Sequence, residues 1–204
     1  MAREYYIRSN ALLFAGIKGL IDDGNELRKD LLFFRPDIIY ITLSREEIDG
    51  LRYFIKNPFE MTLSDYEILY GVNLSRYGEV MTPPPTYIEA VKYAEENDIE
   101  IEPLDMDEGL YQREYSKNVK TMDLIMHSLR KRRIKNKIFR ADSAEEFVDL
   151  WNSYVDVHGF KKLYMRRLEY IRAGIKNALK NDKKMMIIID YDFYNDIKKD
   201  YDLH

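Results

Sequence analysis

Carboxylates follow two of the strands that the sequence predicts. Asp105 comes after a short strand over 99–104, and Asp190 and Asp192 come after the apolar run 185–189. If these strands are neighbours, their carboxylates meet at one edge of an open α/β sheet, where such sheets bind ligands. Carboxylate oxygens suit Mg²⁺ or another divalent cation, and a metal held there could assist a hydrolysis. In this alternative Asp190 and Asp192 bind the metal, and Asp105 is a further ligand or the general base. A structural role accounts for the same pattern, because aspartate is common in turns and helix caps.

The motifs of the common α/β enzymes do not occur in the sequence. There is no cysteine, so there is neither a thiolate nucleophile nor a thiolate metal ligand. The three histidines, His127, His158 and His204, lack the spacing of a zinc site. There is no Gly-x-Ser-x-Gly elbow, P-loop or dinucleotide-binding fingerprint. We therefore expect no cofactor, unless the carboxylates bind a cation.

A basic segment at 130–137 is a second candidate site. Six of its eight residues are Lys or Arg. This density would suit a nucleic-acid backbone, since each neutralised phosphate releases counterions. Consecutive residues of a helix point in all directions, however, and cations are also favoured at a helix C-terminus. A nucleic-acid accessory protein is therefore kept as a further alternative, although nucleic acid is not the partner we expect. Its contacts would come from Arg130, Arg132, Arg133, Lys135 and Lys137.

The composition indicates one folded domain of the cytoplasm. The 204 residues are 46% apolar and 33% charged, which is enough to bury a core. No run approaches the roughly 18 apolar residues of a membrane span, and the first residues do not resemble a signal peptide. We therefore expect no membrane partner.

Charge is divided unevenly along the chain. Residues 1–108 carry 11 Lys and Arg against 22 Asp and Glu, whereas residues 109–204 carry 21 against 14. Such halves can attract each other within the fold or between copies. The chain also has 17 tyrosines, whose amphipathic side chains suit interfaces. From both features we expect a homo-oligomer.

Hydrophobic patterning predicts an α/β domain with a parallel-dominated sheet of about four or five strands flanked by helices. Ser44, with Glu47 three residues later, forms a capping box at the start of a helix. Gly24 and Asn25 open an earlier helix. The predicted strands are 12–17, 38–43, 99–104 and 185–189, and the alternation in 99–104 indicates an edge strand. Helices are predicted over 26–34, between the first two strands, over 45–54 after the second, and over 86–97 before the third.

Two segments elaborate this pattern within a single domain over 1–204. Residues 56–85 are long for a plain connection, so a lid, an Ω-loop or an oligomer contact is expected there. Residues 107–180 are almost entirely helix-forming. They are predicted to be a helical insertion before the last strand.

The order of these segments resembles the TraB/Tiki-like superfamily, which also groups ChaN-like and erythromycin-esterase-like proteins. In the first strand segment Gly16 matches the family pattern, and Gly19 stands where a histidine is expected. In the second, Thr42 replaces a glutamate. In the third, Asp105 matches the family aspartate, and Met106 replaces an arginine.

The end of the chain resembles the terminal motif of the same family. Phe193 occupies its histidine position in the segment 190–197. Since neither glycine nor phenylalanine can act as an imidazole ligand or base, the resemblance implies a retained fold with a degenerate active site. We therefore expect a non-catalytic domain that acts by ligand binding or self-association. Its expected pocket consists of Gly16, Thr42, Asp105, Arg113, Asp190, Tyr191, Asp192 and Phe193.

Overall fold

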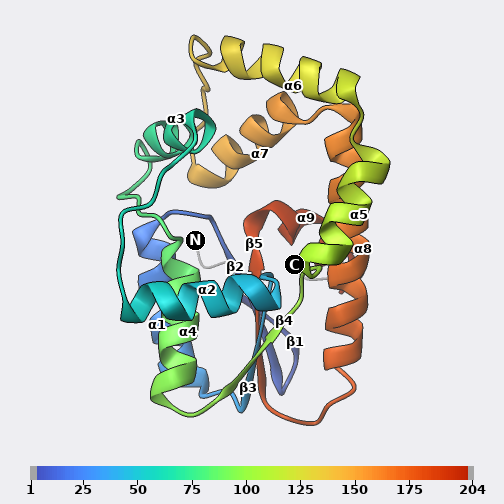
Figure 1. Ribbon diagram of the computed structural model, residues 1–204. Coiled ribbons are helices and arrows are strands. Elements are labelled where there is room, and N and C mark those ends of the chain that lie inside the picture. The colour runs from blue at the N-terminus through green and yellow to red at the C-terminus, as the bar shows by residue number, and fades with distance from the viewer. Residues whose placement is uncertain (1–3, 202–204) are drawn as a thin grey trace.

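A five-stranded sheet forms the centre of the computed structural model, which describes residues 4–201 (Figure 1). The sheet has the order β1-β2-β5-β3-β4, in which only the pair β1–β2 is antiparallel. The predicted α/β class with a parallel-dominated sheet is confirmed. The edge strand β1 was not predicted. The strands are β1 (Glu4–Arg8), β2 (Ala11–Gly16), β3 (Ile38–Ile41), β4 (Glu100–Pro103) and β5 (Met185–Asp190).

Helices follow or separate these strands throughout the described part of the chain. They are α1 (Ile21–Phe34), α2 (Arg45–Lys56), α3 (Asp65–Leu74), α4 (Pro85–Glu96), α5 (Glu108–Asn118), α6 (Thr121–Ile134), α7 (Ala144–Val155), α8 (His158–Ala178) and α9 (Tyr191–Asp200). The predicted capping box at α2 is present, with the Ser44 side chain accepting from the Glu47 backbone and the Glu47 carboxylate from Ser44. The helical stretch before β5 comprises the four helices α5 to α8.

Strand β5 has a core on each of its faces, as its unbroken apolar run predicts. Met186 and Ile188 pack among residues of α1, α2 and α4. Ile187 and Ile189 pack on the other face, against α8 and α9. Figure 1 shows α1 and α4 on one side of the sheet and α8 on the other. This sandwich fixes the carboxyl ends of β2, β3 and β5 beside one another.

Helix α1 begins before the predicted start at Gly24. A side-chain carbon at Gly24 would lie 2.5 Å from Cβ of Pro85, so this glycine allows α1 to approach the start of α4. Gly24 therefore serves helix packing in the interior of α1, and the helix starts at Ile21.

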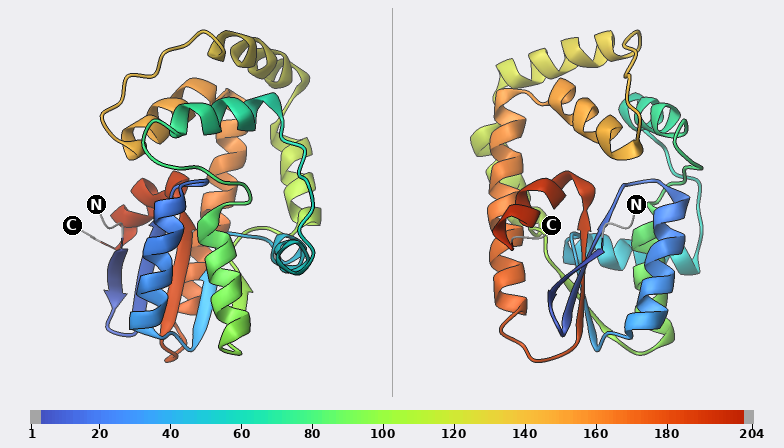
Figure 2. Two further views of the ribbon diagram at one scale, coloured as in Figure 1. Left: turned by 90° about the vertical axis from the view of Figure 1, so that its left-hand side faces the viewer. Right: turned by 180° about the vertical axis from the view of Figure 1, so that it is seen from behind.

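Three helices, α3, α6 and α7, lie above the carboxyl ends of the strands in both views of Figure 2. We call them the helical cap. Trp151 of α7 is buried and donates a hydrogen bond of 2.7 Å to the Tyr66 hydroxyl of α3. The rings of Tyr70, Phe139 and Phe147 also contact Trp151. The segment 56–85 thus contributes a helix to the cap. In residues 4–201, no helix is both long enough and apolar enough to cross a membrane.

Candidate functional site

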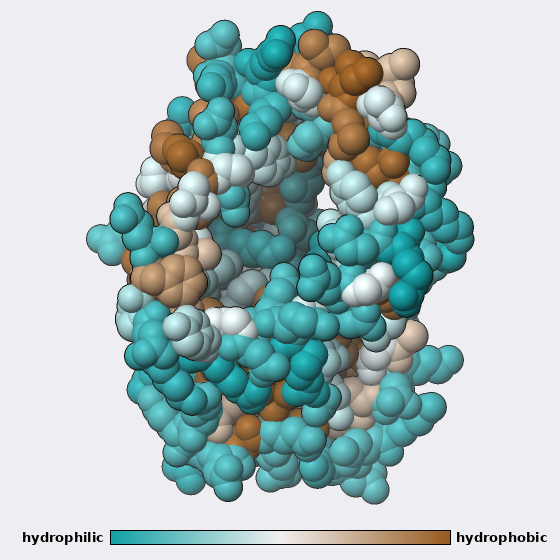
Figure 3. Space-filling view, viewed as in Figure 1, coloured by the Kyte–Doolittle hydropathy of each residue, from teal (hydrophilic) through white to brown (hydrophobic). Residues whose placement is uncertain are grey.

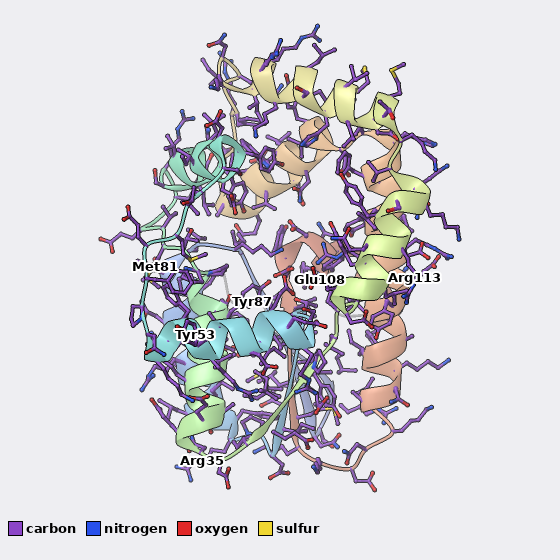
Figure 4. All side chains as sticks on the ribbon, in the orientation of Figure 1. Arg35, Tyr53, Met81, Tyr87, Glu108 and Arg113 are labelled. Carbon is purple, nitrogen blue, oxygen red and sulfur yellow. The ribbon has the colours of Figure 1, made fainter. Side chains whose placement is uncertain are left out.

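Asp190 is the last residue of β5 and lies at the centre of the carboxyl edge of the sheet. Its backbone N–H donates to Oγ1 of Thr42 over 3.0 Å. Its carboxylate accepts a hydrogen bond from the Tyr87 hydroxyl and lies 2.8 Å from Nζ of Lys18. Figure 4 places Tyr87 near the middle of the molecule, at the level of this edge. Asp190 is only 1% exposed, so the nearby charge of Lys18 is what stabilises its buried carboxylate.

Lys18 and Asp190 each shift the pKa of the other towards the charged form. Burial raises the pKa of Asp190 to about 6, although the attraction of Lys18 opposes this. Burial also tends to lower the pKa of Lys18, but Asp190 and Asp192 raise it by more, so the net pKa lies above its ordinary value. Lys18 therefore remains protonated at neutral pH. A protonated amine can be neither a nucleophile nor a base.

Asp105 follows β4 and is paired with a different cation. Its carboxylate accepts hydrogen bonds from the Arg167 guanidinium, including one of 3.1 Å from Nε. The guanidinium carbon lies 5.2 Å from the centre of the Phe193 ring, and Tyr164 stacks on the same ring at 5.1 Å. Phe193 is therefore an apolar ring in contact with two residues of α8, at the position where the family resemblance expects a histidine.

The carboxylates predicted as metal ligands do not form one cluster. The strands that precede Asp105 and Asp190 are not neighbours, because β3 lies between β4 and β5. Each of the two carboxylates has its own basic partner. Within residues 4–201, no group of three His, Asp or Glu side chains is arranged to hold a metal ion.

Asp192 differs from these two residues because it is only partly buried. Its carboxylate accepts a hydrogen bond of 2.7 Å from Asn152 of α7 and lies 3.9 Å from Nζ of Lys18. It thus connects the sheet edge with the helical cap.

A cavity of about 730 Å³ lies between the helical cap, α8 and the start of α9, the helix that directly follows β5. Figure 3 shows the corresponding hollow near the centre of the molecule, with a largely hydrophilic rim. A second cavity of 560 Å³ lies beside it, and both are lined by Tyr66, Asn152 and Asp192. The larger, central cavity is lined by five aromatic residues, Tyr66, Tyr111, Phe160, Tyr164 and Phe193, and by four acidic residues, Asp149, Asp156, Asp192 and Asp196.

The remaining residues of the predicted pocket have other positions. Gly16 ends β2, and a side-chain carbon there would lie 2.7 Å from Thr86 of α4. Tyr191 is buried in the core. Arg113 is exposed on α5 and does not line the central cavity (Figure 4). Of the predicted pocket, Asp192 and Phe193 therefore line this cavity.

The basic segment 130–137 covers the end of α6 and the turn after it. Arg130 donates to the backbone carbonyls of Tyr154 and Asp156, which ties α6 to α7. Nζ of Lys137 lies 4.4 Å from the centre of the Tyr154 ring. Lys135 is 3.6 Å from Asp65. Part of the segment therefore has contacts within the chain, whereas Arg132 and Arg133 are exposed.

Sequence reasoning missed the walls of the central cavity. Asn152, Asp156 and Arg167 come from α7, the turn after it and α8, whose approach to the sheet edge no short motif encodes. Only the helical spacing of Tyr164 and Arg167, three residues apart, places these two side chains on one face. No protein-family model matches this chain, and no curated protein is significantly similar to it.

Proposed function

We propose that this chain is a non-catalytic, TraB/Tiki-like domain that binds a small molecule in the central cavity. The cavity itself carries the proposal. Its volume of about 730 Å³ lies within the range of ligand sites, and it combines aromatic walls with a few polar groups. It also lies beyond the carboxyl ends of parallel strands, where open α/β sheets bind ligands.

The chemistry of the strand ends favours binding over catalysis. The buried carboxylate of Asp190 is held by Lys18 and Tyr87, and Asp105 is held by Arg167. Lys18 is kept protonated by its neighbours. These groups therefore neutralise one another at the strand ends, and of them only Arg167 lines the central cavity.

The single tryptophan offers a direct test of binding. Trp151 lines the second cavity and bonds to Tyr66, which lines both cavities, so its fluorescence should respond to an occupant. A panel of small cationic, anionic and neutral compounds is titrated while this fluorescence is recorded. We expect at least one compound to give a saturable change.

A matched pair of variants locates the binding. Ser153 lines the central cavity, and among residues 4–201 its side chain donates a hydrogen bond only to the Asp149 carbonyl of its own helix, so Ser153→Phe should fill the space. Ser128 is exposed on α6 outside the cavity, so Ser128→Phe is the control. Binding should weaken by about tenfold or more in the first variant only. A divalent-metal-dependent hydrolysis that disappears in Asp192→Ala would instead establish the metal hydrolase.

We also propose that the chain self-associates, because α6 exposes an apolar stripe. Met122, Ile125, Met126 and Leu129 recur at helical spacing and are 66%, 49%, 43% and 42% exposed. The α6 region is the brown patch at the upper right of Figure 3. Light scattering should show an oligomer that Ile125→Glu dissociates and Phe33→Glu, on the exposed side of α1, does not. A monomer at micromolar concentration would contradict self-association.

A further inference from the structure

The aromatic walls of the central cavity come from elements on opposite sides of it. Tyr66 belongs to α3, Tyr111 to α5, and Phe160 and Tyr164 to α8. Ring faces attract cations because of their electron density, and aromatic cages use this attraction to hold ammonium groups. The walls can therefore surround a compact positive charge.

One side chain of the protein, that of Arg167, is itself an organic cation in contact with an aromatic ring of this cavity. The Arg167 guanidinium lies over the ring of Phe193 at 5.2 Å, and Asp105 accepts its hydrogen bonds. Arg167 and Phe193 both line the cavity. A ring face beside a carboxylate is thus a combination that binds a guanidinium within this molecule.

Four acidic side chains line the cavity, and only some of them have a basic side chain as an ion-pair partner. The basic residues that line it are Lys161, Arg167 and His127. Arg167 is already paired with Asp105, and burial lowers the pKa of His127, which favours its neutral form. Asp192 is 3.9 Å from Lys18, and Asp196 is 3.5 Å from Lys199. Two of the four carboxylates, Asp149 and Asp156, form no ion pair with a basic side chain of residues 4–201.

The acidic groups also disfavour one another's charge. Asp149 is exposed on one side, and its partial burial raises its pKa, against hydrogen bonds from Tyr191 and Asn195. The nearby Asp192 and Glu145 raise this pKa further. Burial and Asp192 likewise raise the pKa of Asp156, against Lys161 and Arg130. A bound cation would relieve this repulsion.

We propose that the ligand of the central cavity is a small organic cation, an alkylammonium or guanidinium compound held between the aromatic rings and Asp149, Asp156 and Asp192. This inference rests on the proposed binding function and specifies its ligand class. The cationic group lies against the rings of Phe160 and Tyr164 and supplies the ion-pair partner that Asp149 and Asp156 lack among residues 4–201. Tyr111 and Lys161 also line this cavity.

Isothermal titration with three compounds of one carbon skeleton tests the charge preference. Putrescine carries ammonium groups at its ends, butanediol carries hydroxyls, and succinate carries carboxylates. Agmatine is added as the guanidinium probe. We expect putrescine or agmatine to bind at least about tenfold more tightly than butanediol or succinate, a difference of about 1.4 kcal/mol in binding free energy. High salt should weaken this binding.

Paired variants test which carboxylates take part. Asp149→Asn together with Asp156→Asn removes two charges from the cavity and keeps the shape of each side chain. Asp182→Asn removes one charge from the exposed turn before β5, at the opposite end of the sheet. The double variant should lose about tenfold or more in affinity for the cation, and the control should bind like the parent protein. A thermal melt of the double variant verifies that it is folded.

The outcomes separate this inference from the proposed function. If succinate or butanediol binds in the cavity as tightly as putrescine and agmatine, the cation inference is wrong and the binding function stands. Equal cation affinity in the double variant and its parent would also overturn the inference. If no compound of any charge class binds, the proposed function fails together with it.

Discussion

Nζ of Lys18 lies 2.8 Å from Oδ2 of Asp190, at the carboxyl ends of the neighbouring strands β2 and β5. The carboxylate is buried, whereas the lysine side chain is 38% exposed. The two partners therefore depend on each other unequally. Asp190 needs a nearby cation to stay charged, but Lys18 can reach water or Asp192.

Replacing the lysine should destabilise the protein in a pH-dependent way. Lys18→Met leaves the buried Asp190 without its cation, and we expect a loss of about 2–3 kcal/mol in the free energy of unfolding at about pH 8. This lies below the cost of breaking a fully buried pair, because Lys18 is partly exposed. The variant raises the pKa of Asp190 further above its value of about 6, so the loss should shrink at about pH 5.

Urea denaturation at the two pH values measures this difference. The control is Lys176→Met, which removes an exposed lysine of α8. It should change stability by no more than about 0.5 kcal/mol at either pH. A loss in Lys18→Met that is the same at both pH values would mean that Asp190 does not depend on Lys18.

The close approach of α1 and α4 gives a second prediction. In Gly24→Ala the new Cβ would lie 2.5 Å from Cβ of Pro85, so the two helices must separate. Overpacking should outweigh the gain in helix propensity and cost about 2 kcal/mol. At Gly50 of α2, a new Cβ would have no neighbouring atom of the described residues within 4 Å. Gly50→Ala should therefore raise the free energy of unfolding by about 0.5–1 kcal/mol. Thermal unfolding of both variants should show shifts of opposite sign, and equal shifts would contradict the packing described.

The ring of Phe193 carries a third prediction. Phe193→Leu removes the stacking with Tyr164 and the contact with Arg167, in a site that is 1% exposed. We expect a loss of about 1.5–3 kcal/mol. Phe33 is 84% exposed, so Phe33→Leu should stay within about 0.5 kcal/mol of the parent protein. Denaturant titrations compare the free energies of unfolding of Phe193→Leu and Phe33→Leu. Similarly small losses in both variants would show that the Phe193 ring does not stabilise the packing of α9 on α8.

Asp30 provides a fourth prediction with the opposite pH sign to an ordinary ion pair. Burial and the neighbouring Glu4 raise the pKa of Asp30 to about 7. Because the folded pKa exceeds the unfolded one, the stability that this group contributes is complete below about pH 4 and is lost as the pH rises through about 7. Asp30→Asn should therefore gain about 1 kcal/mol at about pH 8 and little at about pH 5, a modest value because the side chain is only half-buried.

Urea denaturation of Asp30→Asn and of the parent protein at the same two pH values tests this prediction. Asp182→Asn, in an exposed turn, should show no such change with pH. A gain in Asp30→Asn that is larger at low pH than at high pH would reverse the sign and contradict the raised pKa.

Local patterns were sufficient to predict the framework of this fold. The unbroken apolar run of β5 required a core on each face, and both cores are present. Ser44 and Glu47 fixed the start of α2. The alternation of β4 predicted an edge strand, and β4 is the last strand in the sheet order. These features depend on residues close together in the chain.

Other features depend on distant partners and could not be predicted in this way. The half-exposed strand β1 lacks a strong pattern, since its stability comes from pairing with β2. Gly24 was interpreted as a helix start because its contact with Pro85 is invisible in the sequence. Arg167 and Asp105, separated by 62 residues, meet only after α8 has packed beside the sheet. The cavity is therefore a property of the assembled helices.

A crystal structure of the protein with putrescine or agmatine would locate the ligand. We expect ligand density in the central cavity, with an ammonium or guanidinium group near Asp149, Asp156 and Asp192 and against an aromatic ring. We also expect Lys18 to stay on Asp190 and Arg167 to stay on Asp105. Density confined to the outer surface, or a ligand that displaces Lys18 from Asp190, would contradict the proposed cation site.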